Sequence, residues 1–459
     1  MRNINYEFIL KYIDGIAMHK GILPVTGINT DSRSIKGGDL FFALKGENFD
    51  GHEFITQAIT GGAAGVVVSD SFSCPDDAPY SVIQVDDTLT SLQDLAAAYR
   101  QSFSAPVVAV TGSVGKTTTK DLVALCLSDW YLTLKTKGNY NNEIGLPLTL
   151  FDLREKHQVA VVEMGMRAPM EIHRLGEIVK PYHAIITNVE PVHMETMGSL
   201  QNIARAKCEI LSFVDDDHFA LINGDQPLLL EAAKAYSCKT YLFGYDDHCD
   251  IQIKRVESKG LGIEVELKVF DRCESFYLEV PAVQLAADLA AAVGMAYLMG
   301  VDLESIKAQL ISYEPSDNRL KITHLSEGGT IINDTYNANP ISMAAALEAC
   351  KKIAQGKDTV AVLGDMFELG TYSADGHRLV GQKLAQLKFD SLVAIGENAQ
   401  HIVEGALQQG MEETSIHYFK SQDESLEWLQ KNLKKTSVTL FKASRGMHLE
   451  KLILAWLEE

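Results

Sequence analysis

The sequence predicts an α/β protein of three domains. A chain of 459 residues exceeds what one hydrophobic core usually serves. Short β-branched runs alternate with helix-length segments in two separate stretches, which is typical of parallel sheets covered by helices. Two turn-rich interruptions divide the chain. Hydrophobic residues make up 46% and charged residues 22%, as in ordinary globular proteins, so we expect well-formed cores.

The interruptions place the predicted boundaries near residues 104 and 313. Residues 102–106 lead from a first unit into a new strand, and residues 313–318 break a helical pattern with Glu-Pro-Ser-Asp-Asn. We therefore expect a small α/β domain at 1–104, a central domain at 105–313 and a C-terminal domain at 314–459.

The central domain reads as a parallel sheet around a glycine loop. Period-two alternation over residues 251–280 predicts an antiparallel appendage, and a helix is expected from about 283 to 299. The expected parallel strands are Val107–Val110, Val159–Val162, Ala184–Thr187 and Phe219–Ile222. The C-terminal domain repeats the alternation and is expected to be Rossmann-like. Its strand-like runs are Thr330–Asn333, Thr359–Leu363, Ser391–Ile395 and Ser437–Phe441.

Charge and cysteine usage exclude several classes of protein. A net charge of −20 argues against binding nucleic acid or an anionic membrane by general electrostatics. Seven cysteines are scattered without metal-binding spacing, which favours reduced thiols in the cytoplasm. No apolar run approaches the length of a membrane span, and no signal-peptide h-region is evident.

One motif predicts nucleoside triphosphate binding. Residues 111–119 read Thr-Gly-Ser-Val-Gly-Lys-Thr-Thr-Thr between a predicted strand and a predicted helix. Glycines expose backbone N–H groups to a phosphate, the lysine adds charge, and the next hydroxyl suits Mg²⁺. The first glycine of a full Walker A is absent, so a plain strand-turn-helix connection is the alternative. The expected nucleotide contacts are Gly112, Ser113, Gly115, Lys116, Thr117 and Thr118.

Further motifs follow the glycine loop in order along the chain. They are the Asn-Tyr-Asn-Asn-Glu-Ile-Gly stretch from Asn139, Asn-Asp-Thr-Tyr-Asn-Ala-Asn-Pro from Asn333, Gly-Asp-Met-Phe-Glu-Leu-Gly from Gly364, and Lys-Ala-Ser-Arg-Gly-Met from Lys442. Together with the glycine loop they resemble the Mur ligase family, and within it the member that adds D-alanyl-D-alanine. In the first domain, Asp31-Ser32-Arg33 and Asp50-Gly51-His52 resemble the family's UDP-precursor-binding domain.

The resemblance implies an ATP-dependent ligase of peptidoglycan synthesis. A carboxylate of UDP-N-acetylmuramoyl-tripeptide would be activated as an acyl phosphate and joined to D-alanyl-D-alanine, giving the pentapeptide precursor, ADP and phosphate. A monomer is expected. Whether the third residue of the tripeptide is lysine or meso-diaminopimelate stays open.

The resemblance also assigns roles in the central domain. Lys116 would contact the ATP phosphates, and Thr117, Glu163, His193 and Lys207 would surround Mg²⁺. The matching lysine is carbamylated in several members of the family, and whether Lys207 is carbamylated stays open. Asn139, Asn141 and Asn142 would contact substrate. From the residues alone, Glu163 reads equally well as a capping group, and His193 and Lys207 as ordinary surface side chains.

Further groups are implied in the other two domains. Arg319 would contact ATP phosphates, Asp334 the ribose, and Tyr336 or Asn337 the adenosine. The dipeptide or γ-phosphate would be held by Lys442, Ser444 and Arg445. In the first domain the implied contacts to the UDP-precursor are Ser32, Arg33, Asp50, Gly51 and His52. A local turn with a surface arginine is the alternative for Asp31–Arg33.

The sequence departs from the family pattern in residues 281–290. The family's adenine-side histidine and asparagine are missing there, and Asp288 replaces an asparagine, so no adenine-binding residue is assigned. Two other functions remain open. One is the sister ligase that adds the third amino acid, although its Asp-Asn-Pro-Arg-like signature is absent; the other is a regulatory protein with a degenerate ligase fold.

Overall fold

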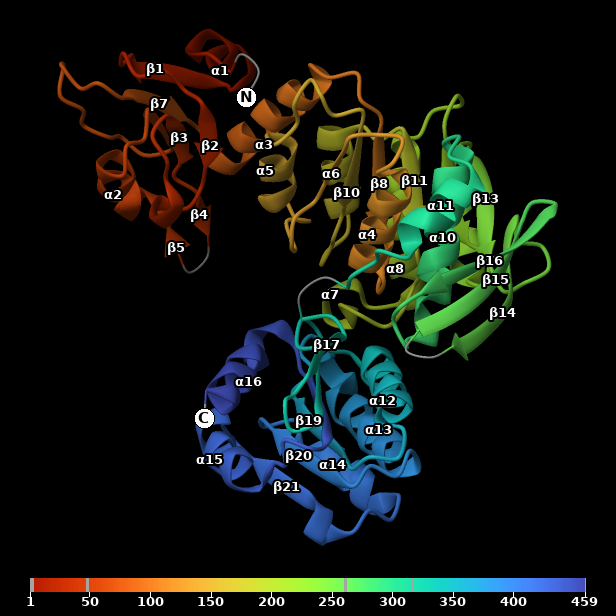
Figure 1. Cartoon of the computed structure of the whole chain (residues 1–459). Coiled ribbons are helices and arrows are strands. Elements are labelled where there is room, and N and C mark those ends of the chain that lie inside the picture. The colour runs from red at the N-terminus through yellow and green to blue at the C-terminus, as the bar shows by residue number, and fades with distance from the viewer. Residues whose placement is uncertain (1–3, 47–48, 260–261, 316–317, 459) are drawn as a thin grey trace.

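The computed structural model describes residues 4–46, 49–259, 262–315 and 318–458. Three α/β bodies follow one another along the chain, with the third packed below the second (Figure 1). The predicted α/β class is confirmed. The boundaries near 104 and 313 stay predictions, and Ser316 and Asp317 of the second interruption lie outside the described residues.

The first body is built on a five-stranded sheet in the order β1-β7-β6-β3-β2. Strand β1 is antiparallel to β7, and the remaining neighbours are parallel. Its strands are β1 (Gly15–His19), β2 (Gly27–Asn29), β3 (Asp39–Phe42), β6 (Gly65–Val68) and β7 (Ser81–Val85), with a small hairpin of β4 (Lys45–Gly46) and β5 (Phe49–Asp50). Its helices are α1 (Tyr6–Tyr12), α2 (Ile55–Thr60) and α3 (Thr88–Gln101).

Helix α3 ties the first body to the second. The Tyr99 hydroxyl donates to the Leu153 carbonyl at 2.9 Å, and Arg174 donates to Gln93 and pairs with Asp94. One buried hydrophobic cluster runs from Ile4 in the first body to the middle of the second. The first two bodies therefore share apolar packing, although their sheets are separate.

The second body contains a nine-stranded sheet in the order β16-β15-β14-β13-β12-β11-β8-β10-β9. Strands β9 to β14 and β8 are mutually parallel, whereas β14, β15 and β16 form an antiparallel meander. The predicted appendage is thereby confirmed. The strands are β8 (Val107–Thr111), β9 (Thr133–Lys135), β10 (Val159–Glu163), β11 (His183–Ile186), β12 (Phe219–Asn223), β13 (Lys239–Gly244), β14 (Ile251–Lys259), β15 (Gly262–Val269) and β16 (Arg272–Leu278).

Alternate side chains of the buried strands pack into two different hydrophobic cores, one on each face of the sheet. Val107 and Ala109 of β8 face the cluster shared with α3, whereas Val108 and Val110 face the cluster under α4 and α10. Helices α4, α10 and α11 lie together on that second face (Figure 1). The helices are α4 (Lys116–Leu127), α5 (Gly145–Leu150), α6 (Glu171–Val179), α7 (Met194–Met197), α8 (Leu200–Cys208), α9 (Pro227–Ala233), α10 (Ala286–Leu298) and α11 (Leu303–Leu310).

The third body has a six-stranded sheet in the order β17-β18-β22-β19-β20-β21. All neighbours are parallel except the edge pair β17 and β18. Its strands are β17 (Lys321–His324), β18 (Thr330–Asn333), β19 (Thr359–Gly364), β20 (Ser391–Ile395), β21 (Ile416–Phe419) and β22 (Val438–Lys442). Helices α12 (Pro340–Ala354), α13 (Ser373–Gln386) and α14 (Gln400–Gln408) pack in one core, and α15 (Gln422–Asn432) and α16 (Leu449–Leu457) in the other.

The four strands expected in the third body all form, within a residue or so of their predicted ends. Edge strands β17 and β21 were not predicted. Among the described residues, no helix combines the length and the apolarity needed to cross a bilayer.

Candidate active site

A cleft of about 1070 Å³ lies between the second and third bodies. Its walls come from the loops that follow β8, β9, β10 and β11, and from the ends of β18, β19 and β22. These are carboxyl ends of parallel strands, where α/β sheets place their ligands. Both sheets therefore direct loop side chains and helix N-termini into one space.

The glycine loop joins β8 to α4 in a conformation that requires its two glycines. Gly112 has φ +152° and Gly115 has φ +80°. A Cβ at Gly112 would stand 1.8 Å from the Thr187 hydroxyl, and one at Gly115 would stand 2.2 Å from an Asp288 oxygen. Helix α4 therefore begins at Lys116 with its N-terminus open to the cleft, as a phosphate site needs.

Lys116 folds back over this loop. Its Nζ donates to the Gly112 carbonyl at 2.8 Å and to the Ser113 carbonyl at 3.2 Å. Desolvation lowers the pKa of Lys116, while the charge of Glu163 acts in the opposite direction. The ammonium group is thus fixed beside the anion site and not extended into solvent.

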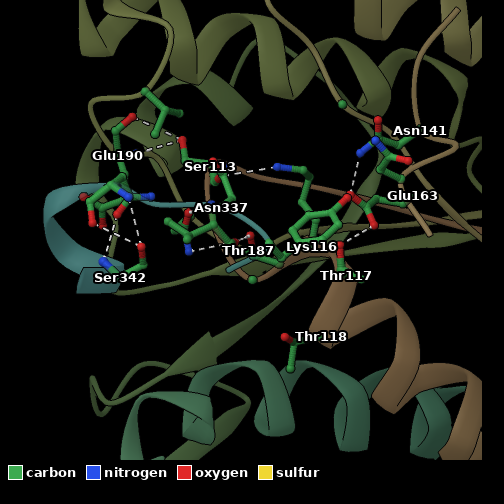
Figure 2. A pocket seen from close by; sticks show the side chains of 18 of the residues that line it. Ser113, Lys116, Thr117, Thr118, Asn141, Glu163, Thr187, Glu190, Asn337 and Ser342 are labelled. Atoms are coloured by element: carbon green, nitrogen blue, oxygen red, sulfur yellow. Dashed lines mark hydrogen bonds between the residues drawn. The ribbon is translucent and has the colours of Figure 1, made fainter. Parts of the chain in front are cut away.

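Glu163 ends strand β10 and is almost fully buried. Its two oxygens accept from the Thr117 hydroxyl at 2.7 Å and from the Asn141 side-chain amide at 2.6 Å, as Figure 2 shows. The Glu163 carboxylate is therefore held in place within the cleft, and the alternative that Glu163 is a solvated or capping group is wrong. Thr117 Oγ1 and Glu163 together offer hard oxygen donors, which suit Mg²⁺.

Lys207 lies inside the protein near Lys116. The residue is 2% exposed on helix α8, and burial, followed by the charge of Lys116, lowers its pKa well below the ordinary value. In the described part of the chain its Nζ has no hydrogen bond or ion pair. Reading Lys207 as a helix-surface lysine is therefore wrong.

His193 faces the third body across the cleft. Its backbone is left-handed, with φ +56°, and its Nδ1 lies 2.9 Å from an oxygen of Glu368. Hydrogen bonding to His193 lowers the pKa of Glu368. His193 thus reaches the cleft, where its partner in this structure is a carboxylate.

Arg319 brings the third body to the phosphate loop. Its Nη2 donates to Thr117 Oγ1 at 2.8 Å, and its guanidinium lies 4.0 Å from the ring centroid of Tyr336. Arg445 stacks more loosely on the same ring, at 5.8 Å. Three residues predicted to bind nucleotide or dipeptide therefore form one stack beside Thr117.

Asp334 and Lys442 form an ion pair with each other. Lys442 Nζ lies 2.5 Å from Asp334 Oδ2 and donates to the Asn337 carbonyl at 2.9 Å, while Asp334 Oδ1 accepts from the Leu320 N–H. The Asn337 side chain caps the next N–H, that of Ala338. The pair braces the segment after β18, and both residues line the cleft.

The other predicted contacts lie along the same walls. Asn139, Asn142, Ser113, Thr118, Ser444 and Arg445 all line the cleft. The side chain of Asn142 accepts the Gly145 N–H and starts helix α5, so its amide orients the loop. Ser444 Oγ accepts the Phe367 N–H at 2.8 Å. These two side chains therefore position backbone as well as facing the cavity.

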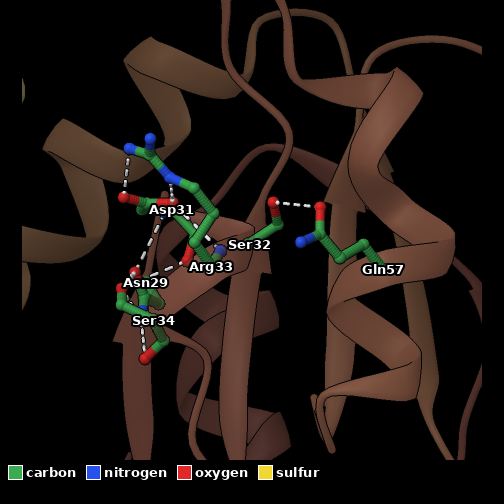
Figure 3. Close-up of polar contacts among 6 residues, drawn as sticks. All are labelled: Asn29, Asp31, Ser32, Arg33, Ser34 and Gln57. Carbon is green, nitrogen blue, oxygen red and sulfur yellow. Dashed lines mark hydrogen bonds and ion pairs between the residues drawn. The ribbon is translucent and has the colours of Figure 1, made fainter.

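The first body carries a second, smaller cavity of about 170 Å³. It is lined by Thr30, Asp31, Ser32, Arg33, Phe41, Phe49 and Phe54. Arg33 pairs with Asp31 at 2.8 Å and is 82% exposed, and the Ser32 hydroxyl donates to Gln57, as Figure 3 shows. The arginine is thus presented at the surface beside aromatic walls, an arrangement that suits a diphosphate and a flat base.

Asp50, Gly51 and His52 do not line that cavity. His52 Nδ1 donates to Asp50 at 2.6 Å, and its Nε2 accepts the Ser69 N–H at 3.0 Å. Gly51 is packed so that a Cβ would lie 2.7 Å from the Leu44 backbone. The three residues fix a turn at the base of the domain, next to Phe49 and Phe54.

Among the cleft carboxylates that were not predicted as site residues, Asp288 and Glu368 contact the predicted site most directly. Asp288 accepts from the Thr119 hydroxyl at 2.9 Å, and desolvation raises its pKa to about 7. Glu368 has left-handed backbone, φ +62°, and meets His193. Asp288 could have been found because it replaces an asparagine of the family pattern. Glu368 could have been found because it lies in the motif that starts at Gly364.

Family profiles match all three bodies. The profile described as "Mur ligase family, catalytic domain" matches residues 24–100, "Mur ligase middle domain" matches 110–296, and "Mur ligase, glutamate ligase domain" matches 318–445. The three matches follow one another along the chain in the order of the three bodies.

Curated relatives and solved structures extend this similarity. The chain is 38% identical over 429 residues to a UDP-N-acetylmuramoyl-tripeptide--D-alanyl-D-alanine ligase of Bacillus subtilis, covering 94% of this chain and 92% of the relative. It is 34% identical to the enzyme of the same name from Escherichia coli, covering 83% of each chain. A crystal structure of MurF from Acinetobacter baumannii superposes with a TM-score of 0.88 at 32% identity, covering 99% of both chains. MurF of Thermotoga maritima in complex with ADP gives 0.80 at 28% identity, covering 96% of this chain and 99% of that one. The chain belongs to the Mur ligase family.

Proposed function

We propose that this chain joins D-alanyl-D-alanine to UDP-N-acetylmuramoyl-tripeptide at the expense of ATP, in peptidoglycan synthesis. The observation that carries the proposal is the contact of Arg319 with Thr117, because it brings groups of two bodies to one phosphate site. The curated relatives of Bacillus subtilis and Escherichia coli bear the name of this activity.

The chemistry needs two anions to approach each other. Lys116, the N–H groups at the start of α4 and Arg319 would neutralise the ATP phosphates, so that the tripeptide carboxylate can attack the γ-phosphorus and release ADP. The amine of the dipeptide then attacks the acyl carbon, loses a proton and expels inorganic phosphate. Closure of the cleft would keep water from the acyl phosphate.

The residues present fit a magnesium site. Thr117 and Glu163 supply oxygen atoms within hydrogen-bonding distance of each other, and His193 lies at the same cleft. Bound Mg²⁺ would supply charge neutralisation at the phosphates. Lys207 fits carbamylation, because this reaction needs a neutral amine and Lys207 is buried, unpaired among the described residues and lowered in pKa. A carbamate would change this buried amine into an anionic oxygen donor.

The remaining roles follow from the cavity walls. Asp334, Tyr336 and Asn337 would face the nucleoside, and Asn139, Asn141, Asn142, Lys442, Ser444 and Arg445 would face the acyl and dipeptide groups. Ser32 and Arg33 would hold the UDP portion, with Asp50, Gly51 and His52 shaping its pocket. We propose that the protein works as a cytoplasmic monomer.

Phosphate release from ATP tests the proposal. Release should require both UDP-N-acetylmuramoyl-tripeptide and D-alanyl-D-alanine, and should fall to background when either is omitted or when Mg²⁺ is chelated. If phosphate release is the same with and without D-alanyl-D-alanine, the dipeptide is not the acceptor.

A further inference from the structure

Glu368 differs in its partners from three other carboxylates that line the cleft. Glu163, Asp288 and Asp334 are each satisfied by groups fixed around them: Thr117 and Asn141, Thr119, and Lys442. Glu368 is instead 51% exposed, and its partners are His193 at 2.9 Å and Arg167 at 3.8 Å, both from the opposite body. Its carboxylate is therefore charged and open to exchange partners with a ligand.

The backbone just before Glu368 is held by two side chains. The Met366 N–H donates to the buried His377 Nε2 at 2.9 Å, and the Phe367 N–H donates to Ser444 Oγ at 2.8 Å. Glu368 itself has φ +62°, a left-handed conformation that non-glycine residues rarely adopt. The backbone that carries Glu368 is therefore fixed, which limits the positions that its carboxylate can reach.

The Glu368 carboxylate contacts His193, and the segment that carries His193 is bonded to the phosphate loop. His193 belongs to the segment after β11, and the Glu190 N–H of the same segment donates to Ser113 Oγ at 2.9 Å (Figure 2). A group held by Glu368 thus lies on the side of the cleft where phosphate chemistry occurs. Phe367, which precedes Glu368, and Ile341 are exposed side chains that line the same cleft and offer apolar contacts to small side chains.

A dipeptide acceptor is a zwitterion whose ammonium end must approach the activated carboxyl. We infer that the Glu368 carboxylate holds the ammonium group of the incoming dipeptide, with its side-chain methyls against Phe367 and Ile341; the inference rests on the proposed function. Binding exchanges the histidine partner for the ligand. Glu368 orients the amine before the amine loses its proton, and selects against acceptors that lack a positive charge.

The test compares Glu368→Gln with wild-type protein, using free D-alanyl-D-alanine and its N-acetyl derivative as probes. Loss of one charge-assisted hydrogen bond should raise KM for the free dipeptide roughly 10- to 100-fold. KM for ATP and for the tripeptide precursor should change by less than about threefold. Inhibition by the N-acetyl dipeptide, which has no ammonium group, should be the same in both proteins.

Two further variants sharpen the result. Glu368→Asp keeps the charge and should recover part of the lost affinity. Glu195→Gln is the matched control, because Glu195 is exposed and lies beside Gly370 of the same contact region; its KM for the dipeptide should equal that of the wild type.

Three outcomes would overturn the inference. If KM for the dipeptide is unchanged in Glu368→Gln and the wild type turns over normally, Glu368 does not bind the ammonium group, and the proposed function still stands. An equal rise in KM for all three substrates would show that Glu368 acts only as a contact between the two bodies. Wild-type protein without dipeptide-dependent turnover would overturn the proposed function as well.

Discussion

Arg319 Nη2 donates a hydrogen bond to Thr117 Oγ1 across the cleft at 2.8 Å. Thr117 also donates to Glu163, so one hydroxyl connects the acidic group of the central sheet to a guanidinium of the third body. This relationship couples the position of the third body to the phosphate loop. A nucleotide at the loop would therefore meet cationic groups from both bodies.

Replacing Arg319 by lysine tests that coupling. Lysine keeps the charge but loses the planar fork that reaches Thr117 and stacks on Tyr336. We expect kcat to fall by about 100-fold, the order found when one preorganised charge-stabilising donor is removed. Steady-state turnover with saturating ATP measures it, with the exposed Arg255→Lys as control. A kcat equal to that of the wild type would exclude Arg319 from the reaction.

Lys116→Ala should abolish turnover while the protein stays folded. Among the described residues, the Lys116 ammonium group contacts only loop carbonyls. The alanine variant therefore lacks this positive charge at the phosphate site, while the hydrophobic core is unchanged. We expect a loss of at least about 100-fold in phosphate release, with an unchanged circular dichroism spectrum. The exposed Lys234→Ala serves as control. Near-normal phosphate release by folded Lys116→Ala would show that the loop is not the ATP site.

Lys207 tests the proposed carbamate. Lys207→Ala should lose most activity, with partial recovery on adding short carboxylates such as acetate, since these replace the missing oxygen donor. A carbonyl carbon bound to Lys207 should appear in carbon NMR spectra of protein supplied with labelled bicarbonate. Full activity of Lys207→Ala without additives would reject the role.

Asp288 should make stability depend on pH. Desolvation raises its pKa to about 7 in the folded protein, from an ordinary value of 3.8. Between these values the unfolded carboxyl is ionised and the folded one is not, so this group stabilises the fold below pH 4 and the contribution is lost as pH rises through 7.

Asp288→Asn removes this titration. The variant should lose less stability than the wild type when pH is raised from 5 to 8, and its midpoint of thermal unfolding should exceed that of the wild type at pH 8. Parallel pH profiles for the two proteins would contradict a buried, neutral Asp288.

Much of this site could be predicted because its residues directly follow strands. Val107–Val110 and Val159–Val162 were recognisable as buried parallel strands, and their ends carry the glycine loop and Glu163. The partners could not be predicted, because they come from distant segments: Asp334 and Lys442 are 108 positions apart, and Glu368 meets His193 only through the packing of two bodies. Edge strands β17 and β21 are four residues each, like the predicted β18, but none of their residues is buried, so no buried apolar run marks them.

Mass spectrometry of the product tests the central claim most directly. Purified protein would receive ATP, Mg²⁺, D-alanyl-D-alanine and both UDP-N-acetylmuramoyl-tripeptides, one ending in lysine and one in meso-diaminopimelate. A second reaction would offer the UDP-N-acetylmuramoyl-dipeptide with each free amino acid. We predict that a tripeptide gains the dipeptide in the first reaction, giving the pentapeptide precursor, and that the second gives no product. Addition of a single amino acid to the dipeptide precursor, without dipeptide addition to either tripeptide, would contradict the account and identify the sister activity instead.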